Sequence, residues 1–166
     1  LHGYWQHTGY FEPYLKEITD MMTPAYGQSE LVKKLCAEFQ TTDTCAVHVR
    51  GGDIVGPGRA FFERALVRME KERPGLRYLV FTNDKEAAKE ALEGEHTERK
   101  MTYISELGAF SDVDEFFLMA ACRHQIISNS SYSTWAAYLN PNPEKVVIMP
   151  EYKGCEQIRL KEWIVL

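Results

Sequence analysis

Three short polar segments could carry chemistry, and each directly follows an apolar stretch. Arg50 to Asp53 (RGGD) follows TCAVHV, Thr82 to Asp84 (TND) follows RYLVF, and Asn129 to Ser131 (NSS) follows HQIIS. An arginine presents a planar fork of donors that matches phosphate oxygens. Glycines let backbone N–H groups approach an anion closely. Together the three segments predict one binding site for a phosphorylated ligand, if the fold brings them to the same edge.

Each segment also has a purely structural interpretation. Gly51 and Gly52 could form an ordinary turn, with Arg50 as a surface charge. A lone His48 in a strand is more typical of a hydrogen-bonded residue than of a catalyst.

The other two segments are equally open. Ser130 or Ser131 could simply cap a helix, although free N–H groups at a helix start also favour anions. Thr82 and Asn83 could meet a base or ribose, whereas Asp84 could cap the helix that follows. Trp135 and Tyr138 are most simply core residues.

The segments are expected to be positioned by strands that alternate with helices. Short apolar runs predict strands at 44–49, 77–81, 101–104, 124–128 and 145–149. Periodic apolar residues and caps predict helices at 10–22, 29–39 and 57–73, after Asp84, from 111 to 122, and from Ser130 or Ser131. In the second helix Leu31, Leu35 and Phe39 form the expected inner stripe. In the third helix the expected inner residues are Phe61, Phe62, Ala65, Leu66 and Met69.

This alternation predicts an α/β fold: a Rossmann-like, three-layer domain with a parallel sheet covered on both faces. Ligands of such sheets bind outside the carboxyl ends of the strands, where the three polar segments fall. We expect one domain over 1–166, with leading helices in 1–42 and the Rossmann-like core in 43–166.

Composition excludes several classes of protein. The chain has 166 residues, 45% of them hydrophobic, which suits one domain with a full core. Its net charge of −5 gives no basic field for nucleic acid. No stretch is long and apolar enough to span a bilayer. The four cysteines have no metal-binding spacing, Cys45 and Cys122 are expected in the core, and a disulfide between distant cysteines stays open.

Three stretches of the sequence resemble the bacterial α-1,2-fucosyltransferases. VHVRGGDIV resembles the H-x-R-R-x-D signature shared by α-1,2-, α-1,6- and protein O-fucosyltransferases. LMAACRHQIISNSSYSTWAAYL resembles the second α-1,2 signature, L-M-x-x-C-x-H-x-I followed by N-S-S/T-F-S-W-W-x-A-W-L. GYWQHTGYF resembles the family's G-Y-[FW]-Q stretch. The matches come in the family's order and extend over nearly the whole chain.

The resemblance implies one half of a GT-B fold, the donor-binding half, without the family's N-terminal domain. The first residue is Leu1 rather than Met, so we expect a fragment or a processed product. Without the family's N-terminal domain, the isolated fragment is expected to be inactive. Gly51 stands where the family has a second arginine, whereas Arg50 matches the arginine that the family places on the donor diphosphate. Tyr132 and Thr134 replace the usual Phe and Trp of the second signature.

The implied reaction is an inverting, metal-independent transfer of fucose from GDP-fucose to a sugar hydroxyl in α-1,2 linkage. The expected partners are GDP-fucose and a galactoside-type glycan, with no cofactor, no metal and no nucleic acid. Arg50 and Asp53 are the predicted catalytic residues, although Asp53 could equally anchor its own loop. The predicted donor-binding residues are His48, Arg50, Gly51, Gly52, Thr82, Asn83, Asp84, Asn129, Ser130, Ser131 and Ser133.

The sequence also bears on metal binding, on location and on alternative functions. The D-x-D string formed by Asp112 and Asp114 is interpreted as a helix cap rather than a metal site. The expected location is the cytoplasm, with peripheral contact to the inner membrane left open. The alternatives are a non-catalytic GT-B remnant that still holds a nucleotide sugar, and an unrelated nucleotide-binding Rossmann domain, for which no glycine-rich fingerprint is present.

Overall fold

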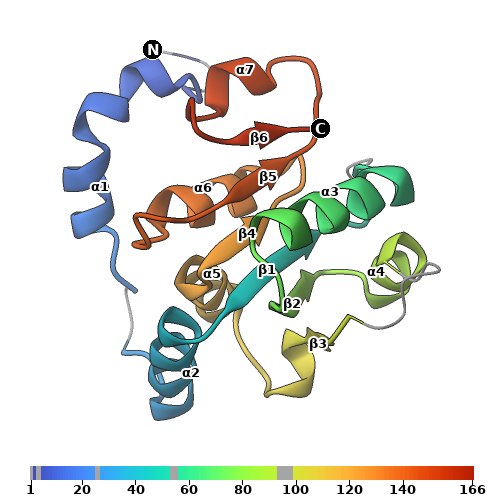
Figure 1. Cartoon of the computed structure of the whole chain (residues 1–166). Coiled ribbons are helices and arrows are strands. Elements are labelled where there is room, and N and C mark those ends of the chain that lie inside the picture. Colours follow the sequence, from blue (N-terminus) through green and yellow to red (C-terminus); the bar gives the residue numbers. More distant parts are fainter. Residues whose placement is uncertain (1, 3–4, 25–26, 53–55, 93–98) are drawn as a thin grey trace.

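The computed structural model describes residues 2, 5–24, 27–52, 56–92 and 99–166. Its centre is a six-stranded, all-parallel sheet with the strand order β3-β2-β1-β4-β5-β6 (Figure 1). The strands are β1 (Thr44–Val49), β2 (Arg77–Thr82), β3 (Met101–Tyr103), β4 (His124–Ile126), β5 (Val147–Met149) and β6 (Ile164–Val165). The predicted Rossmann-like α/β class is therefore confirmed.

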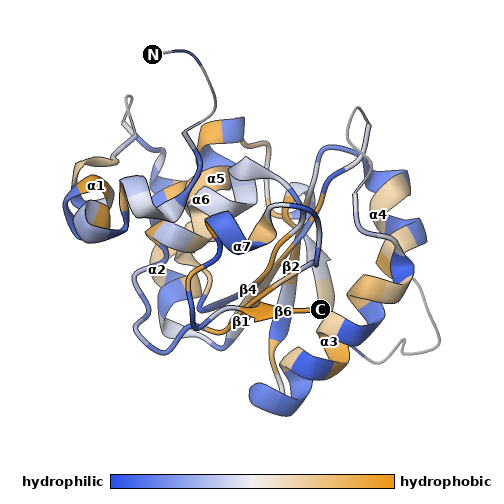
Figure 2. Cartoon of the chain, turned by 90° about the horizontal axis from the view of Figure 1, so that it is seen from above, coloured by the Kyte–Doolittle hydropathy of each residue, from blue (hydrophilic) through white to orange (hydrophobic). Residues whose placement is uncertain are grey.

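Helices cover both faces of the sheet, which makes three layers. Seen from above, α3 (Arg59–Glu72) and α4 (Lys85–Leu92) lie on one side of the strands (Figure 2). On the other side lie α2 (Glu30–Thr41), α5 (Asp112–Ala121) and α6 (Ser131–Leu139). The helices are hydrophobic where they face the strands and hydrophilic outside, as the periodicity of the sequence requires.

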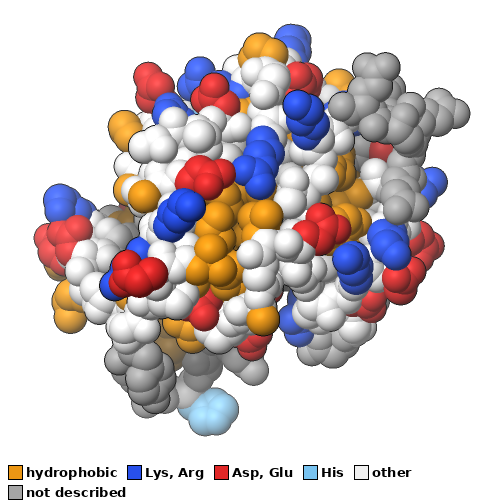
Figure 3. All heavy atoms as spheres, turned by 90° about the horizontal axis from the view of Figure 1, so that it is seen from below, with side chains coloured by type: hydrophobic (Ala, Val, Ile, Leu, Met, Phe, Trp, Pro, Cys, Tyr) orange, Lys and Arg blue, Asp and Glu red, His pale blue; other side chains and the backbone are white. Residues whose placement is uncertain are grey.

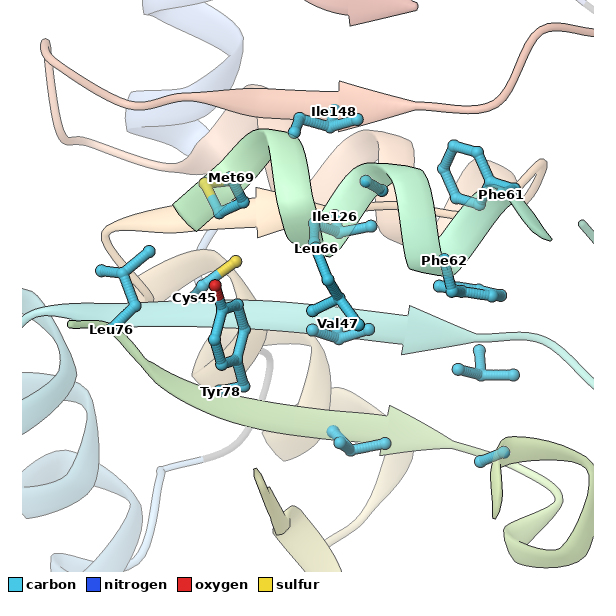
Figure 4. Close-up of a cluster of buried hydrophobic side chains, with 14 residues drawn as sticks. Cys45, Val47, Phe61, Phe62, Leu66, Met69, Leu76, Tyr78, Ile126 and Ile148 are labelled. Carbon is cyan, nitrogen blue, oxygen red and sulfur yellow. The ribbon is translucent and has the colours of Figure 1, made fainter. Parts of the chain in front are cut away.

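The core between α3 and the sheet follows the sequence pattern closely. Alternate residues of β1, including Cys45 and Val47, point toward α3, and the five residues predicted on the inner face of that helix are all buried (Figure 4). Tyr78 of β2 packs in the same cluster, and its hydroxyl donates to Glu70 Oε2 at 3.0 Å. This packing fixes β1, and therefore the segment that follows it.

The second core, between the sheet and α2 and α5, corrects one prediction. Val32, Leu35 and Phe39 are the buried residues of α2, whereas Leu31 is 45% exposed. Leu35 and Phe39 are therefore buried as predicted, and only the first residue of the stripe is wrong, since Val32 takes the place of Leu31. The N-cap is Ser29, whose side chain accepts from the Val32 amide at 3.3 Å.

The N-terminal segment is less regular than the single helix predicted from Tyr10. Two 3-10 turns, η1 (Thr8–Tyr10) and η2 (Glu12–Tyr14), precede a short α1 (Leu15–Met21). Pro13 lies in η2 and has no N–H to donate, which agrees with the α-helix starting only after it. This segment packs beside α6, where Phe11 contacts the rings of Trp135 and Tyr138.

Two C-terminal elements escaped the sequence analysis. They are α7 (Cys155–Ile158), whose N-cap is Gly154 at φ 94°, and the edge strand β6. Together with a third 3-10 turn, η3 (Ile104–Glu106), they complete the fold. A third hydrophobic cluster joins this end to α6 and contains Cys155, Tyr138 and Trp163.

The cysteines and the surface agree with the composition. All four cysteines lie within the described residues and are free, and Cys45 and Cys122 are fully buried as predicted. Acidic and basic side chains are interspersed around a central hydrophobic area on the face seen from below (Figure 3). Within the described ranges, no helix has the length and apolar character needed to cross a membrane.

Candidate functional site

The three polar segments end neighbouring parallel strands, so they share the carboxyl edge of the sheet. β1 lies between β2 and β4, which places the Arg50 segment between the Asn83 and Asn129 segments. A hydrogen bond of 2.8 Å between His48 Nδ1 and Ser128 Oγ ties the ends of β1 and β4 together. The connection through α3 covers one face and α6 starts on the other, which is the arrangement that opens a ligand crevice.

A charged pocket of about 210 Å³ lies at this edge, on the α5 and α6 side. Its lining combines residues from four elements, and we refer to it as the charged pocket. The lining residues are His48, Arg50, Phe81, Thr82, Asn83, Asp112, Glu115 and Tyr132. Four of the predicted donor-binding residues therefore meet in one cavity: His48, Arg50, Thr82 and Asn83.

The loop after Arg50 is held by the second segment. The Gly51 amide donates to Asn83 Oδ1 at 3.0 Å, and Asn83 Nδ2 donates to the Gly51 carbonyl at 3.0 Å. Gly52 has φ 84°, a conformation that favours glycine. A Cβ atom at position 51 would lie 2.5 Å from the Cβ of Asp84, so the backbones pack too closely for a side chain.

Thr82 and Asp84 also serve the local structure. Asp84 Oδ1 accepts from the Ala87 amide at 3.0 Å, so the predicted capping of α4 is confirmed. The Thr82 hydroxyl donates to the Asp84 carbonyl and accepts from its amide.

Arg50 also lines a cavity of about 480 Å³ on the α3 and α4 side, together with Arg59. Asp53, the predicted second catalytic residue, lies outside the described residues.

His48 is a neutral, fixed side chain of this pocket. It is 5% exposed, and its ring contacts Tyr132 with 5.7 Å between centroids. Burial, together with the Arg50 guanidinium, lowers the pKa of His48 to about 4. An uncharged imidazole with one nitrogen on Ser128 can orient a ligand or exchange a hydrogen bond, but it adds no positive charge at pH 7.

The acidic side of the pocket comes from α5 and was not predicted as part of the site. Asp112 and Glu115 lie three residues apart on one face of the helix. Burial raises the pKa of Glu115, and the neighbouring Asp112 adds to the effect. Tyr132 donates from its hydroxyl to the Asp112 carbonyl at 2.5 Å, and burial raises the pKa of this phenol. The lining of this pocket thus combines one arginine with two carboxylates.

The D-x-D string is divided between two roles. Asp114 completes a capping box with Ser111: its Oδ2 accepts from the Ser111 amide at 3.2 Å, and Ser111 Oγ accepts from the Asp114 amide at 3.2 Å. The capping interpretation is therefore confirmed for Asp114, whereas Asp112 lines the charged pocket. Among the described residues, no group of three His, Cys, Asp or Glu is placed to hold a metal ion.

The third polar segment lines a different, neighbouring cavity of about 250 Å³, which we refer to as the aromatic pocket. Its lining residues are Gln6, Phe11, Asn129, Ser130, Ser131, Thr134, Trp135, Tyr138, Tyr152 and Ile158. α6 begins between the two pockets, because Ser131 lines the aromatic pocket and the next residue, Tyr132, lines the charged one. The structure thus brings the segments to one edge but divides them between two cavities.

The hydroxyls at the start of α6 do not cap it as expected. Ser130 is the N-cap residue, but its side chain makes no capping hydrogen bond. The Ser130 carbonyl accepts from the hydroxyls of Ser133 and Thr134 at 3.2 and 3.0 Å. Ser133 is fully buried and lines neither pocket, whereas the first N–H groups of α6 have no side-chain cap from Ser130.

The aromatic residues of the second pocket were predicted only as core. Tyr138 is buried, and its hydroxyl donates to the Ile158 carbonyl, which agrees with that prediction. Trp135 is only half-buried and also lines the cavity. The signal for Asp112 and Glu115 was their spacing on a helix face. Gln6 belongs to the GYWQ stretch of the family resemblance, whereas Tyr152 reaches the pocket from a distant segment and gave no sequence signal.

Comparison with known proteins fits this geometry. The model of "Glycosyl transferase family 11" matches residues 1–166. The chain is 27% identical over 151 residues to the O-antigen biosynthesis glycosyltransferase WbnK of Escherichia coli, covering 79% of this chain and 48% of that protein. It is 29% identical over 158 residues to an alpha-1,2-colitosyltransferase of Escherichia coli, covering 89% and 53%.

The chain therefore spans about half the length of the curated relatives it matches. The family match, in contrast, extends over all of it, including both signature stretches and the edge of the sheet where their residues meet. On this evidence the chain belongs to glycosyl transferase family 11.

Proposed function

We propose that this chain is the donor-binding half of a GT-B glycosyltransferase that transfers fucose from GDP-fucose to a sugar hydroxyl. The observation that carries the proposal is the convergence of Arg50, the Gly51–Asn83 loop and the uncapped start of α6 at one sheet edge. A guanidinium and free N–H groups at one edge suit a diphosphate. An inverting α-1,2 transfer is supported by the two signatures and by the linkage named for the second relative.

The leaving diphosphate gains negative charge as its bond to the sugar breaks, while the sugar ring becomes positive. Donors that are already in place stabilise this charge more in the transition state than in the ground state. Arg50 supplies a fixed positive charge, and its loop is held by the bonds between Gly51 and Asn83. In this proposal no metal is needed, because the arginine and the helix start take the role of a cation.

The base of the nucleotide is assigned to the acidic side of the charged pocket. A carboxylate accepts hydrogen bonds, and guanine offers adjacent N–H donors on its Watson–Crick edge. Glu115 and Asp112 present such acceptors beside the neutral His48 and the ring of Phe81. We therefore propose GDP rather than ADP as the nucleotide, with Glu115 as the main acceptor.

The deprotonation of the acceptor hydroxyl stays with Asp53 or with a part of the protein beyond this chain. The proposed acceptor is a galactoside-type glycan. A colitosyl donor is the second candidate, because one relative is named for that sugar. A GT-B remnant that binds nucleotide without transfer is the non-catalytic alternative.

Calorimetry with GDP and ADP tests the nucleotide assignment. We expect GDP to bind at least about tenfold tighter than ADP, a difference of about 1.4 kcal/mol. Glu115→Gln should remove most of this preference, since an amide replaces one acceptor by a donor. Glu106→Gln is the matched control, because Glu106 lies outside the pocket and pairs with Lys85 at 3.7 Å.

Two further measurements separate the alternatives. Binding of GDP should be the same with and without a chelator, and loss of binding in the chelator would refute metal independence. A transfer assay on the full-length protein with GDP-fucose and GDP-colitose distinguishes the two donors. GDP binding without any transfer would favour the remnant.

A further inference from the structure

The aromatic pocket has a composition unlike that of the charged pocket beside it. None of the described residues that line it is charged, whereas the charged pocket holds Arg50, Asp112 and Glu115. Its walls combine rings from Phe11, Trp135 and Tyr152 with hydroxyl and amide groups. Such a lining suits a ligand, or a part of a ligand, that is uncharged and has both apolar and hydrogen-bonding surfaces.

The exposed parts of the wall indicate what such a ligand would meet. Trp135 and Tyr152 are half-buried, Asn129 is half-buried, and Ser131 and Gln6 are exposed. The Tyr138 hydroxyl cannot donate its proton to a ligand, because it already donates to the Ile158 carbonyl. Burial raises the pKa of Tyr152 to about 12, so its hydroxyl stays protonated and can donate at neutral pH.

A pyranose ring has this combination of surfaces. Its C–H groups carry slight positive charge and pack on the negative face of an aromatic ring, while its hydroxyls exchange hydrogen bonds with amides and hydroxyls. A cavity of about 250 Å³ is smaller than the roughly 300–1,000 Å³ of sites for drug-sized ligands, which suits a single sugar unit.

The position of the cavity is the second argument. The first turn of α6 separates it from the charged pocket, with Ser131 on one side and Tyr132 on the other. A nucleotide in the charged pocket with its diphosphate at the start of α6 would direct the attached sugar, and the reacting hydroxyl, toward this side.

We propose that the aromatic pocket is a subsite for one neutral pyranose, with Trp135 as the stacking platform and Tyr152, Asn129 and Ser131 as hydrogen-bonding groups. The inference deepens the proposed function and rests on it for the source of the sugar. That source is either the sugar of the donor or the first sugar of the acceptor, which share the same chemistry.

The test measures binding of methyl fucoside and methyl β-galactoside to the chain by ligand-observed NMR. At least one of them should bind to the wild type, and Trp135→Ala should weaken that binding by about tenfold or more. Tyr152→Phe removes only a hydroxyl and should weaken it by a smaller factor without affecting folding. Tyr14→Phe is the matched control, because Tyr14 is 62% exposed and lines neither pocket.

Calorimetry then identifies the source. If the donor sugar occupies the pocket, Trp135→Ala removes the affinity difference between GDP-fucose and GDP but leaves GDP binding unchanged. If the acceptor occupies it, the same variant leaves both nucleotides unchanged and removes galactoside binding to the GDP-loaded chain. Either result supports the inference.

The sugar subsite and the nucleotide site can be tested independently of each other. Normal binding of both sugars to Trp135→Ala and Tyr152→Phe would overturn the sugar subsite, even if GDP binds well. So would an absence of sugar binding to a wild-type chain that binds GDP. Sugar binding that depends on Trp135 in a chain that does not bind GDP would leave the subsite standing and refute the nucleotide assignment.

Discussion

Asn83 and Gly51 exchange two hydrogen bonds, each of 3.0 Å, between the side-chain amide of one and the backbone of the other. The pair joins the loop after β2 to the loop after β1, directly beside Arg50. A side-chain amide that satisfies both an N–H and a C=O group replaces the water that would otherwise solvate this loop. The position of Arg50 is therefore set from a neighbouring strand.

Asn83→Ala should consequently weaken GDP binding by about tenfold, because two hydrogen bonds to the Arg50 loop are lost together. Calorimetry measures the affinity, and a urea titration checks that the fold persists. The control is Asn142→Ala, which lies at the amino ends of the strands. There the side-chain Nδ2 of Asn142 donates to the Arg123 carbonyl at 3.0 Å, and its Oδ1 accepts from the Glu144 backbone amide at 3.1 Å. An equal loss of affinity in both variants would contradict a positioning role.

Arg50→Ala in the full-length enzyme should reduce transfer by about a hundredfold or more, as expected for the loss of one preorganised donor. Arg50→Lys should recover only part of the rate, because an ammonium lacks the planar fork. Arg59→Ala provides the comparison, since Arg59 lines the cavity on the other face and donates to the Glu90 carbonyl at 3.0 Å. Near-normal turnover by Arg50→Ala would refute the assignment.

Gly51→Ala should destabilise the fold by about 1–3 kcal/mol, because the added methyl group would lie 2.5 Å from the Cβ of Asp84. Chemical denaturation measures the change. In an Asp84→Gly background the opposing Cβ is absent, so the same substitution should cost clearly less. Equal costs in the two backgrounds would show that the close contact is not the cause. Gly51→Arg is likewise expected to distort the loop rather than restore the family's second arginine.

Stability should fall as the pH drops below about 6.5. Burial and Arg50 lower the pKa of His48 from 6.5 to about 4 in the folded chain, so the unfolded chain binds the proton first. The stabilisation is complete above pH 6.5 and is lost as pH falls toward 4, by up to about 3 kcal/mol. Urea midpoints between pH 7.5 and 4.5 should show a shallower slope for His48→Gln. An unchanged slope would contradict a buried neutral imidazole.

His124 should add to the same slope from the other end of the sheet. Burial, followed by Arg73, lowers its pKa to about 4. Its Nδ1 accepts from the Val146 amide at 3.1 Å, a bond that is lost on protonation. The dependence of the urea midpoint on pH should therefore be shallower for the double variant His48→Gln/His124→Gln than for either single variant.

The sequence predicted five of the six strands and their polar edge, because strands such as β1 are short runs with β-branched residues and are followed by glycines. It predicted the face of α3 correctly, since five apolar residues define a stripe without ambiguity. In α2 both Leu31 and Val32 are apolar, and only packing against the sheet decides between them. The pattern predicted Leu35 and Phe39 correctly but could not choose between Leu31 and Val32.

The sequence predicted that the three polar segments would meet at one edge of the sheet, but not that they would be divided between two cavities. Strand order decides which loops share a cavity, and no local pattern encodes it. Asp112 and Tyr132 come from two helices and meet only because α5 and α6 pack side by side. The hydroxyl of Ser130 is of the right type for a cap, but it makes no capping hydrogen bond.

The three hydrophobic clusters each contain one fully or largely buried cysteine: Cys45 under α3, Cys122 beside α5, and Cys155 at α7. A buried thiol reacts with an alkylating reagent only when its surroundings open. Mass spectrometry of timed alkylation can therefore follow the opening of each layer separately, without any engineered probe. The alkylation rates of these three cysteines therefore report local unfolding separately in each of the three hydrophobic clusters.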